Sequence, residues 1–350
     1  MNKFIKLLMV VILTSVISPF SLYPSSVFAD NKIIYSTDLF NDGDFDDYFD
    51  LIALKSLEGI DSTIILDGNE QITTRGGASA IENLDIITGE TTKYTLGLNE
   101  NSYFYKDRGW KSHSFLQRNI QNIISEIQQA PEKTTIVTVG SLRDISAAYN
   151  REPNLFREKV SKIYIFAGDY KGTYKEHNVE LDELAYLNVM NSGLSIFWIP
   201  CFEEGLWTYG DNSSYFTVKH SELFTNSESP LFKWFLYRFI KETIPFESFL
   251  NNEYNGTLFL EDMRNLWVAP LLSILDGGWD SYIDKYNLEN NTALSSPITF
   301  EPVTAKFLKE GKVDYTQGNK IMKLKIVDRD EYVSLSKYII KEMIKRVEGM

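Results

Sequence analysis

Residues 33–54 read IIYSTDLFNDGDFDDYFDLIAL and decide the fold. The apolar start of this stretch predicts a short buried strand, and residues 48–54 predict a helix. Between them, five aspartates fall within the ten positions from Asp38 to Asp47. Carboxylates crowded at a strand end repel one another, and a hard divalent cation with oxygen ligands relieves that repulsion. The loop therefore predicts a metal or catalytic site. The alternative is an acidic loop in which Asp46 or Asp47 only caps the helix.

Two other acidic motifs fit this loop poorly. An EF-hand starting at Asp42 needs Gly at position six and Glu at position twelve, but those positions hold Asp47 and Ala53. A phosphatase-type nucleophile at Asp38 is disfavoured because nothing nearby in the sequence is suited to cradle a phosphate. The metal hypothesis is therefore the one that the loop favours.

Strand-like and helix-like runs alternate through the first half of the chain. Strands are expected at 33–37, 62–66, 134–139, 162–166 and 194–199, with helices between them. This alternation predicts an α/β fold with an open, mostly parallel sheet and helices on both faces. Later in the chain, 257–260 suggests a short strand, and 298–303, 313–315 and 323–326 predict a small antiparallel appendage near the C-terminus. No linker or repeat divides the sequence, so we expect residues 30–350 to form a single α/β domain.

The first 29 residues have the pattern of a signal peptide. Lys3 and Lys6 precede an apolar core at residues 7–20, and Val27-Phe28-Ala29 has the small-residue pattern of a cleavage site. We therefore expect a secreted or extracytoplasmic protein with no membrane contact after cleavage. A retained signal anchor is the alternative.

Composition narrows the class of partner. The formal net charge of −13 argues against the phosphate backbone of nucleic acid and leaves a small molecule as the expected ligand. The only cysteine, Cys201, rules out an internal disulfide, and it follows an apolar run that predicts a buried, inert thiol. A homo-oligomer is compatible with the sequence, which leaves the oligomeric state open.

Polar groups follow the predicted parallel strands at their carboxyl ends, where such sheets bind ligands. They are the aspartates of 38–47, Asn69, the segment 139–141 and the loop 176–182. We expect these groups to converge on one crevice.

The order of these motifs resembles the inosine–uridine preferring nucleoside hydrolase family. The resemblance is carried by the Asp-rich turn 38–47, Asp67-Gly68-Asn69, the run VGSLRD at 139–144, and Glu176-His177-Asn178 followed by Asp182. It spans residues 33–200, roughly half the chain. The resemblance implies a tightly bound Ca²⁺ and hydrolysis of the N-glycosidic bond of ribonucleosides, releasing base and ribose, as in purine and pyrimidine salvage.

The resemblance also implies metal ligands in the first half of the chain. Asp47 would be a bidentate calcium ligand, and Val139 would contribute its backbone carbonyl. Asp38 would be another ligand and the base that activates the attacking water. Asp42 stands at the family's spacing before Asp47, so it is the alternative to Asp38 as a metal ligand.

Four residues would hold the sugar by the same resemblance. Asp46 and Asn69 would bind the ribose 2′- and 3′-hydroxyls, and Glu176 and Asn178 would bind the 5′ side.

The family's late His-Asp pair, which supplies the leaving-group acid and a calcium ligand, has no direct counterpart. Glu261 is the nearest substitute acid and Asp262 the nearest ligand, although both could be surface residues. His177 could act as the acid, but alternation in an extended loop would point it away and favours packing.

Two further matters stay open at this point. Five aromatic residues could stack on a base, although core placement is the alternative for each: Trp110, Tyr170, Tyr174, Trp207 and Trp267. The alternative function is a non-catalytic, secreted nucleoside- or sugar-binding protein on the same fold.

Overall fold

The computed structural model describes residues 32–39, 45–68 and 76–350. The predicted signal peptide, Asp42 and Asn69 lie outside these described residues. Among the helices of the described residues, none has the length and apolar character that crossing a bilayer requires.

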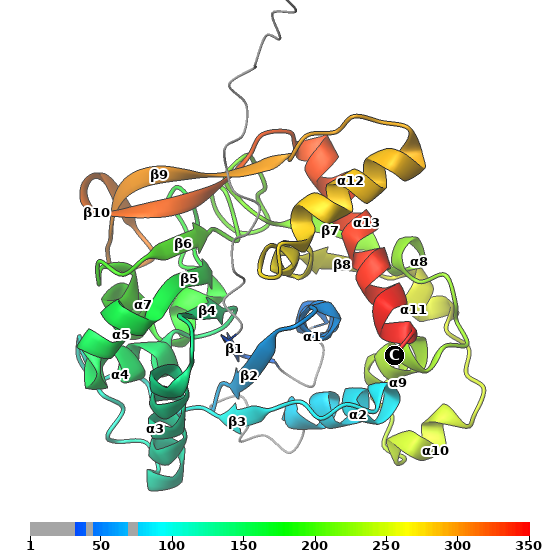
Figure 1. Ribbon diagram of the computed structural model, residues 1–350, viewed down its shortest axis with the longest axis horizontal. Helices are drawn as coiled ribbons and strands as arrows, with labels where there is room; N and C mark the ends of the chain where they lie inside the picture. The colour runs from blue at the N-terminus through cyan, green and yellow to red at the C-terminus, as the bar shows by residue number, and fades with distance from the viewer. Residues whose placement is uncertain (1–31, 40–44, 69–75) are drawn as a thin grey trace, which may run out of the picture.

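Eight strands form the main sheet (Figure 1): β1 Lys32–Thr37, β2 Asp61–Leu66, β3 Tyr94–Leu96, β4 Thr134–Thr138, β5 Val160–Phe166, β6 Ile196–Ile199, β9 Ile298–Phe307 and β10 Val313–Ile326. Their order across the sheet is β3-β2-β1-β4-β5-β6-β10-β9. All neighbours pair in parallel except β9 and β10, which form an antiparallel hairpin. Parallel neighbours require crossover connections, which helices supply here. The predicted mostly parallel α/β class is confirmed.

Helices cover both faces of the sheet (Figure 1). One face carries α3 Ser114–Gln129, α4 Arg143–Arg151, α5 Pro153–Lys159 and α7 Glu183–Met190. The other carries α1 Asp46–Ser56, α2 Ala78–Thr88, α9 Pro230–Phe239, the 3₁₀ helix η2 Ala269–Ile274, α12 Gly278–Asn290 and α13 Arg329–Glu348. Side chains of β1 alternate between the two cores, with Ile33 and Tyr35 in one and Ile34 in the other. Both faces are therefore buried, which explains the continuous apolar runs of the central strands.

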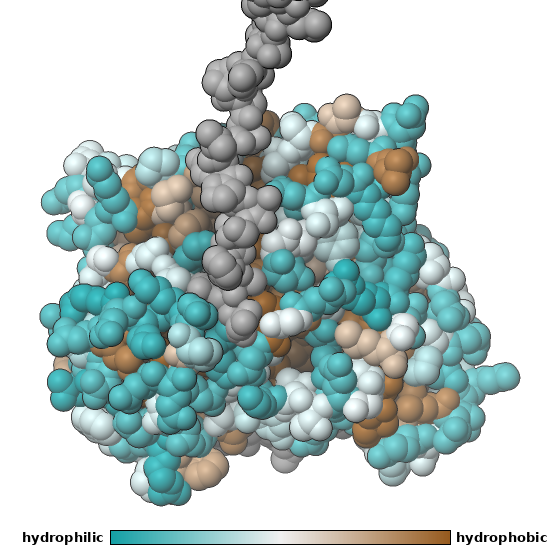
Figure 2. Space-filling view, in the orientation of Figure 1, coloured by the Kyte–Doolittle hydropathy of each residue, from teal (hydrophilic) through white to brown (hydrophobic). Residues whose placement is uncertain are grey.

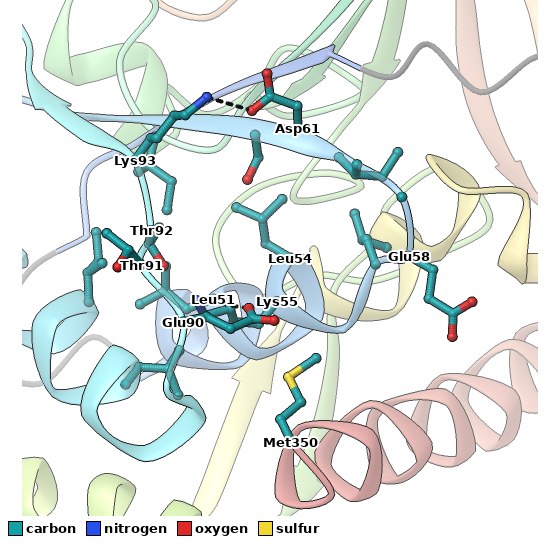
Figure 3. Close-up of a pocket in the computed structure, with 17 residues that line it drawn as sticks. Leu51, Leu54, Lys55, Glu58, Asp61, Glu90, Thr91, Thr92, Lys93 and Met350 are labelled. Carbon is teal, nitrogen blue, oxygen red and sulfur yellow. Dashed lines mark hydrogen bonds and ion pairs between the residues drawn. The ribbon is translucent and has the colours of Figure 1, made fainter.

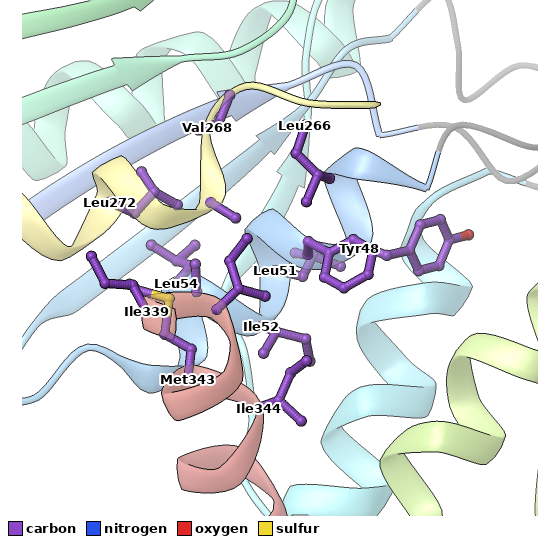
Figure 4. Close-up of a cluster of buried hydrophobic side chains, with 14 of the residues drawn as sticks. Tyr48, Leu51, Ile52, Leu54, Leu266, Val268, Leu272, Ile339, Met343 and Ile344 are labelled. Atoms are coloured by element: carbon purple, nitrogen blue, oxygen red, sulfur yellow. The ribbon is translucent and has the colours of Figure 1, made fainter. Parts of the chain in front are cut away.

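Helix α1 is buried almost all round, which is typical of a helix enclosed by other elements. In Figure 4, Leu51, Ile52 and Leu54 of α1 lie among side chains of η2 and α13, such as Leu272 and Met343. This packing fixes the first turn of α1, which carries two of the predicted site aspartates.

The second half of the chain adds α8 His220–Leu223, α10 Phe246–Leu250, α11 Thr257–Glu261 and a two-stranded antiparallel sheet of β7 Phe216–Lys219 and β8 Met263–Leu266. The strand predicted at 257–260 is wrong, because this run forms α11. A short apolar run has no decisive periodicity, and here Phe259 packs against the aromatic ring of Phe232 of α9. The C-terminal hairpin is longer than predicted, and β10 joins β6 in the main sheet.

The face shown in Figure 2 is covered largely by hydrophilic residues, in keeping with the charged composition.

Candidate active site

A cavity of about 320 Å³ lies at the carboxyl ends of β1, β4 and β5. Residues that follow these strands line it, together with the first turns of α1 and of α6, which spans His177–Leu181. One side of the cavity is acidic and the other is aromatic. The expected convergence of groups after parallel strands is therefore present for Asp38, Asp46, Asp47, Val139 and residues 176–178, whereas Ser141 and Asp182 do not line the cavity.

The acidic side begins with Asp38, which directly follows β1, and continues with Asp46, Asp47 and Asp50 of α1. Asp38 and Asp47 are buried, with 8% and 6% of their surface exposed. The hydroxyl of Thr37 donates to the Asp47 carboxylate over 3.2 Å. Asp46 and Asp47 are therefore not the helix cap, because the N-cap residue of α1 is Phe45, and both line the cavity together with Asp38.

One further hydroxyl serves this acidic side. Tyr35 donates to Asp50 over 3.2 Å, and burial, together with the neighbouring Asp50 carboxylate, raises the pKa of Tyr35. The phenol therefore stays protonated and remains a donor to the carboxylate.

Gly140 brings the end of β4 against Asp38. A Cβ atom at Gly140 would lie 2.5 Å from the Asp38 backbone nitrogen and 2.8 Å from Asp38 Oδ1. The neighbouring Val139 donates its N–H to Ser36 over 2.8 Å, which extends the pairing of β1 and β4. Only glycine permits this approach, so the Val-Gly step positions both the Val139 carbonyl and the Asp38 carboxylate.

Glu176 and Asn178 hold the end of β5. Glu176 caps α6, and its two carboxylate oxygens accept the N–H groups of Gly168 (2.8 Å) and Asn178 (3.0 Å). Burial raises the pKa of Glu176, and these backbone donors oppose that rise. The Asn178 amide donates to the carbonyls of Phe166 (2.9 Å) and Val139 (3.3 Å).

His177 corrects the sequence expectation. It is the first residue of α6 rather than part of an extended loop, so strand alternation does not apply. Its side chain is 66% exposed, and Nε2 lies 3.7 Å from Asp38 Oδ2. The expected packing role is wrong, and His177 stands beside the acidic side of the cavity.

Glu261 and Asp262 do not reach the cavity. Glu261 ends α11, is 63% exposed and pairs with Lys219 over 2.5 Å. Asp262 pairs with Arg264 over 2.9 Å. The sequence left open whether Glu261 and Asp262 belong to the site or to the surface, and the structure supports the surface for both.

The late segment that does line the cavity is Trp267-Val268, which directly follows β8. With Tyr174, Phe202 and Trp207 it forms the aromatic side, where the rings of Trp207 and Trp267 lie 6.1 Å apart. Trp207 is 52% exposed, so it stands at the mouth. The position of Val268 and Phe202 carried no signal in the sequence, because it depends on how the β7–β8 sheet packs.

The donor set suits a hard cation. Asp38, Asp47 and the Val139 carbonyl offer oxygen atoms, the ligand class that Ca²⁺ prefers. Across residues 32–39, 45–68 and 76–350, no three His, Cys, Asp or Glu side chains form a metal-binding group. A calcium site here would therefore draw on the Val139 carbonyl, on water or on Asp42, which lies outside the described residues.

A buried ionic network joins residues that follow β2, β4 and α6. The Arg143 guanidinium, 1% exposed, contacts Asp67 over 2.6 Å and Asp182 over 3.4 Å. Ser141 also donates to Asp67. Burial and the Asp67 charge raise the pKa of the neighbouring Asp144 to about 7. The network links the residues that follow β2 to those that follow β4.

A larger cleft of about 670 Å³ opens near the amino end of β2 (Figure 3). Its lysines are already paired: Lys93 with Asp61 over 3.0 Å, and Lys55 with Asp85 over 2.9 Å and Glu90 over 3.3 Å. Size alone does not make a site, and the smaller cavity has the convergent groups.

The sequence matches no protein-family model and no curated protein. Solved structures match nearly the whole chain. A plant nucleoside hydrolase is 15% identical, with a TM-score of 0.54, over 89% of this chain and 99% of its own. A purine-preferring ribonucleoside hydrolase from Gardnerella vaginalis is 14% identical, with a TM-score of 0.54, over 90% and 99%. The type III effector XopQ, solved with adenosine diphosphate ribose, is 10% identical, with a TM-score of 0.54, over 89% and 93%.

The chain therefore has the nucleoside-hydrolase fold. The resemblance read from the sequence is confirmed at that level, including the C-terminal half, where the sequence carried no motif.

Proposed function

We propose that this protein hydrolyses the N-glycosidic bond of ribonucleosides in a calcium-dependent reaction, releasing base and ribose. The observation that carries the proposal is the cavity in which Asp38, Asp46, Asp47, Glu176 and Asn178 converge at the strand ends. A scaffold alone gains nothing from burying these acidic groups together, because buried carboxylates cost stability unless they are paired.

Asp38 is the base that takes a proton from the attacking water, since its buried carboxylate faces the cavity. His177, 3.7 Å away, is placed to pass that proton to solvent. Asp46, Glu176 and Asn178 bind sugar hydroxyls, and their nearby oxygens favour the positive charge that develops on the ribose ring as the base departs.

Asp38, Asp47 and the Val139 carbonyl would hold Ca²⁺, with Asp42 as a further candidate. The ion, when bound, lowers the pKa of a coordinated water and so eases formation of the nucleophile. We further propose that the protein acts outside the cytoplasm after removal of residues 1–29, on small-molecule nucleosides.

The test is release of free ribose from a panel of ribonucleosides, with calcium and with a chelator. We expect chelator-sensitive release, and we expect Asp47→Ala to lose both calcium binding and turnover. Asp284→Ala, which removes an exposed carboxylate of α12, is the matched control and should behave as the parent protein. If Asp47→Ala keeps its calcium and turnover, the assigned roles are wrong. If the folded parent releases no ribose from any ribonucleoside, hydrolysis itself is wrong.

The second candidate is a nucleoside- or sugar-binding protein without catalysis. Its support is the late segment Trp267-Val268, which brings neither a carboxylate nor an imidazole to the cavity. Calorimetric binding of a nucleoside without ribose release would identify this alternative.

A further inference from the structure

The two sides of the cavity differ in their chemistry. Five carboxylates, those of Asp38, Asp46, Asp47, Asp50 and Glu176, stand on or near one side. Aromatic rings form the other side. Among the described residues that line the cavity there is no lysine or arginine, and His177 is the one basic side chain. A bound group is therefore surrounded by negative charge and by ring faces.

Among the described residues, the aromatic side holds no carboxyl, imidazole or amino group that could protonate a departing base. The N–H and O–H groups on this side belong to the Trp207 and Trp267 indoles and to the Tyr174 phenol, which donate hydrogen bonds. The Trp267 indole N–H is buried and has no hydrogen-bond partner in the described structure. The Cys201 thiol also lines the cavity, and burial raises its pKa well above the usual value.

None of the three histidines of the chain lies among the aromatic rings, where it could protonate a departing base. His113 is exposed at the start of α3 and lies outside the cavity lining. His220 is fully buried, and its Nδ1 lies 2.8 Å from the Phe259 carbonyl. His177 stands at Asp38, on the acidic side, rather than among the aromatic rings.

We propose that the preferred substrates are cationic N-ribosides, in which the ring nitrogen bonded to the sugar belongs to a quaternised heteroaromatic base. This inference rests on the proposed hydrolase function and names its substrate class. The C1′–N bond breaks with its electron pair passing to the cationic ring, which leaves as a neutral base and needs no proton. The water oxygen bonds to C1′, and its proton passes to Asp38 and then to solvent.

The geometry favours such a ring in binding as well as in departure. Cations are attracted to the faces of tryptophan and tyrosine rings, and Trp207, Trp267 and Tyr174 offer such faces. The carboxylates concentrate cations in the cavity, and this remains so with one divalent ion bound. A neutral nucleoside gains neither effect, and its base leaves as an anion unless the base is protonated.

The size of the preference follows from the absence of a leaving-group acid among the described residues of the aromatic side. General acid catalysis typically contributes about 10²- to 10⁴-fold. We therefore expect kcat/KM, divided by the uncatalysed rate of each substrate, to be on the order of 100-fold higher for a cationic riboside than for its neutral counterpart.

The matched probes are 7-methylinosine and inosine, compared at a mildly acidic pH at which the methylated ring keeps its N1 proton, so that they differ by one methyl group and one positive charge. A preference of that size for 7-methylinosine supports the inference. Equal or faster normalised hydrolysis of inosine overturns it and leaves the proposed hydrolase function standing. Hydrolysis of neither probe, by protein shown to be folded, overturns the hydrolase function and the inference with it.

A variant pair isolates the contribution of the rings. Trp207→Leu removes an exposed ring from the cavity mouth, whereas Tyr209→Leu removes a 66% exposed ring of the same loop that does not line the cavity. We expect Trp207→Leu to raise KM for 7-methylinosine about 10-fold, consistent with one lost cation–π contact, and to change KM for inosine less. The Tyr209 variant should match the parent. An equal rise in KM for both probes in Trp207→Leu would show that the ring does not favour the cationic substrate over the neutral one.

Discussion

Replacing Gly140 by alanine tests whether the close approach of β4 to β1 sets the geometry of the acidic side. The added Cβ would lie 2.5 Å from the Asp38 backbone nitrogen, whereas ordinary contacts begin at 3.4 Å. Relief of the clash therefore requires a displacement of about 0.9 Å at the residue proposed as the base. A misplacement of about 1 Å can cost about 10²-fold in rate. We expect Gly140→Ala to lose about 100-fold in kcat, although it removes no chemical group from the cavity.

The assay is ribose release, with unfolding followed by circular dichroism. Gly349→Ala is the control, because its Cβ would lie 3.4 Å from the nearest atom, which is an ordinary contact. We expect the control to keep its activity. A folded Gly140→Ala protein that retains kcat within about threefold of the parent would refute the idea that this contact positions Asp38.

Three further predictions concern buried ionisable side chains that do not line the cavity. Arg143→Met removes the cation that pairs with the buried Asp67 and Asp182. We expect urea unfolding to show that the free energy of unfolding falls by about 3 to 5 kcal/mol. A fall below about 1 kcal/mol would contradict the role of the network. Asp144 has a folded pKa of about 7 against an ordinary 3.8, so its contribution to stability is lost as pH rises between these values, by about 4 kcal/mol. Asp144→Asn should remove this fall from unfolding curves measured at pH 4 to 7. Burial lowers the pKa of His220 from 6.5 to about 4, so the protein loses about 3 kcal/mol of stability as pH falls through that range. His220→Phe should abolish this loss. An unchanged pH dependence of stability in the Asp144 variant or in the His220 variant would contradict the role assigned to that residue.

The fold was predictable where a strand is buried on both faces. Runs such as residues 33–37 and 134–138 are buried throughout because helices cover both faces of the sheet, and their β-branched and aromatic residues mark them as strands. The strand β3 was missed because its three residues, Tyr94–Leu96, are not fully buried and carry no such run. Residues 257–260 were assigned to a strand because four residues cannot separate a period of 2 from one of 3.6.

The candidate site was predictable where its groups follow parallel strands. Asp38, Val139 and Glu176 could be placed together because the carboxyl ends of such strands share one edge. The contribution of the late segment Trp267-Val268 could not be predicted, since it depends on the position of the β7–β8 sheet rather than on a strand of the main sheet. Glu261 had the right chemistry but lies on α11, and the Trp267-Val268 segment, six residues further on, enters the cavity instead.

The residues of the motif 139–144 that face away from the cavity explain a second limit of motif matching. Asp67 directly precedes Gly68 in a motif expected to bind sugar, yet its carboxylate accepts from Ser141 and pairs with Arg143. An aspartate at the end of β2 is buried, with 2% of its surface exposed, so it needs a cation within reach. Arg143 supplies that cation from the first turn of α4. The charged positions of the two motifs therefore pair with each other, and this pairing links the end of β2 to the start of α4.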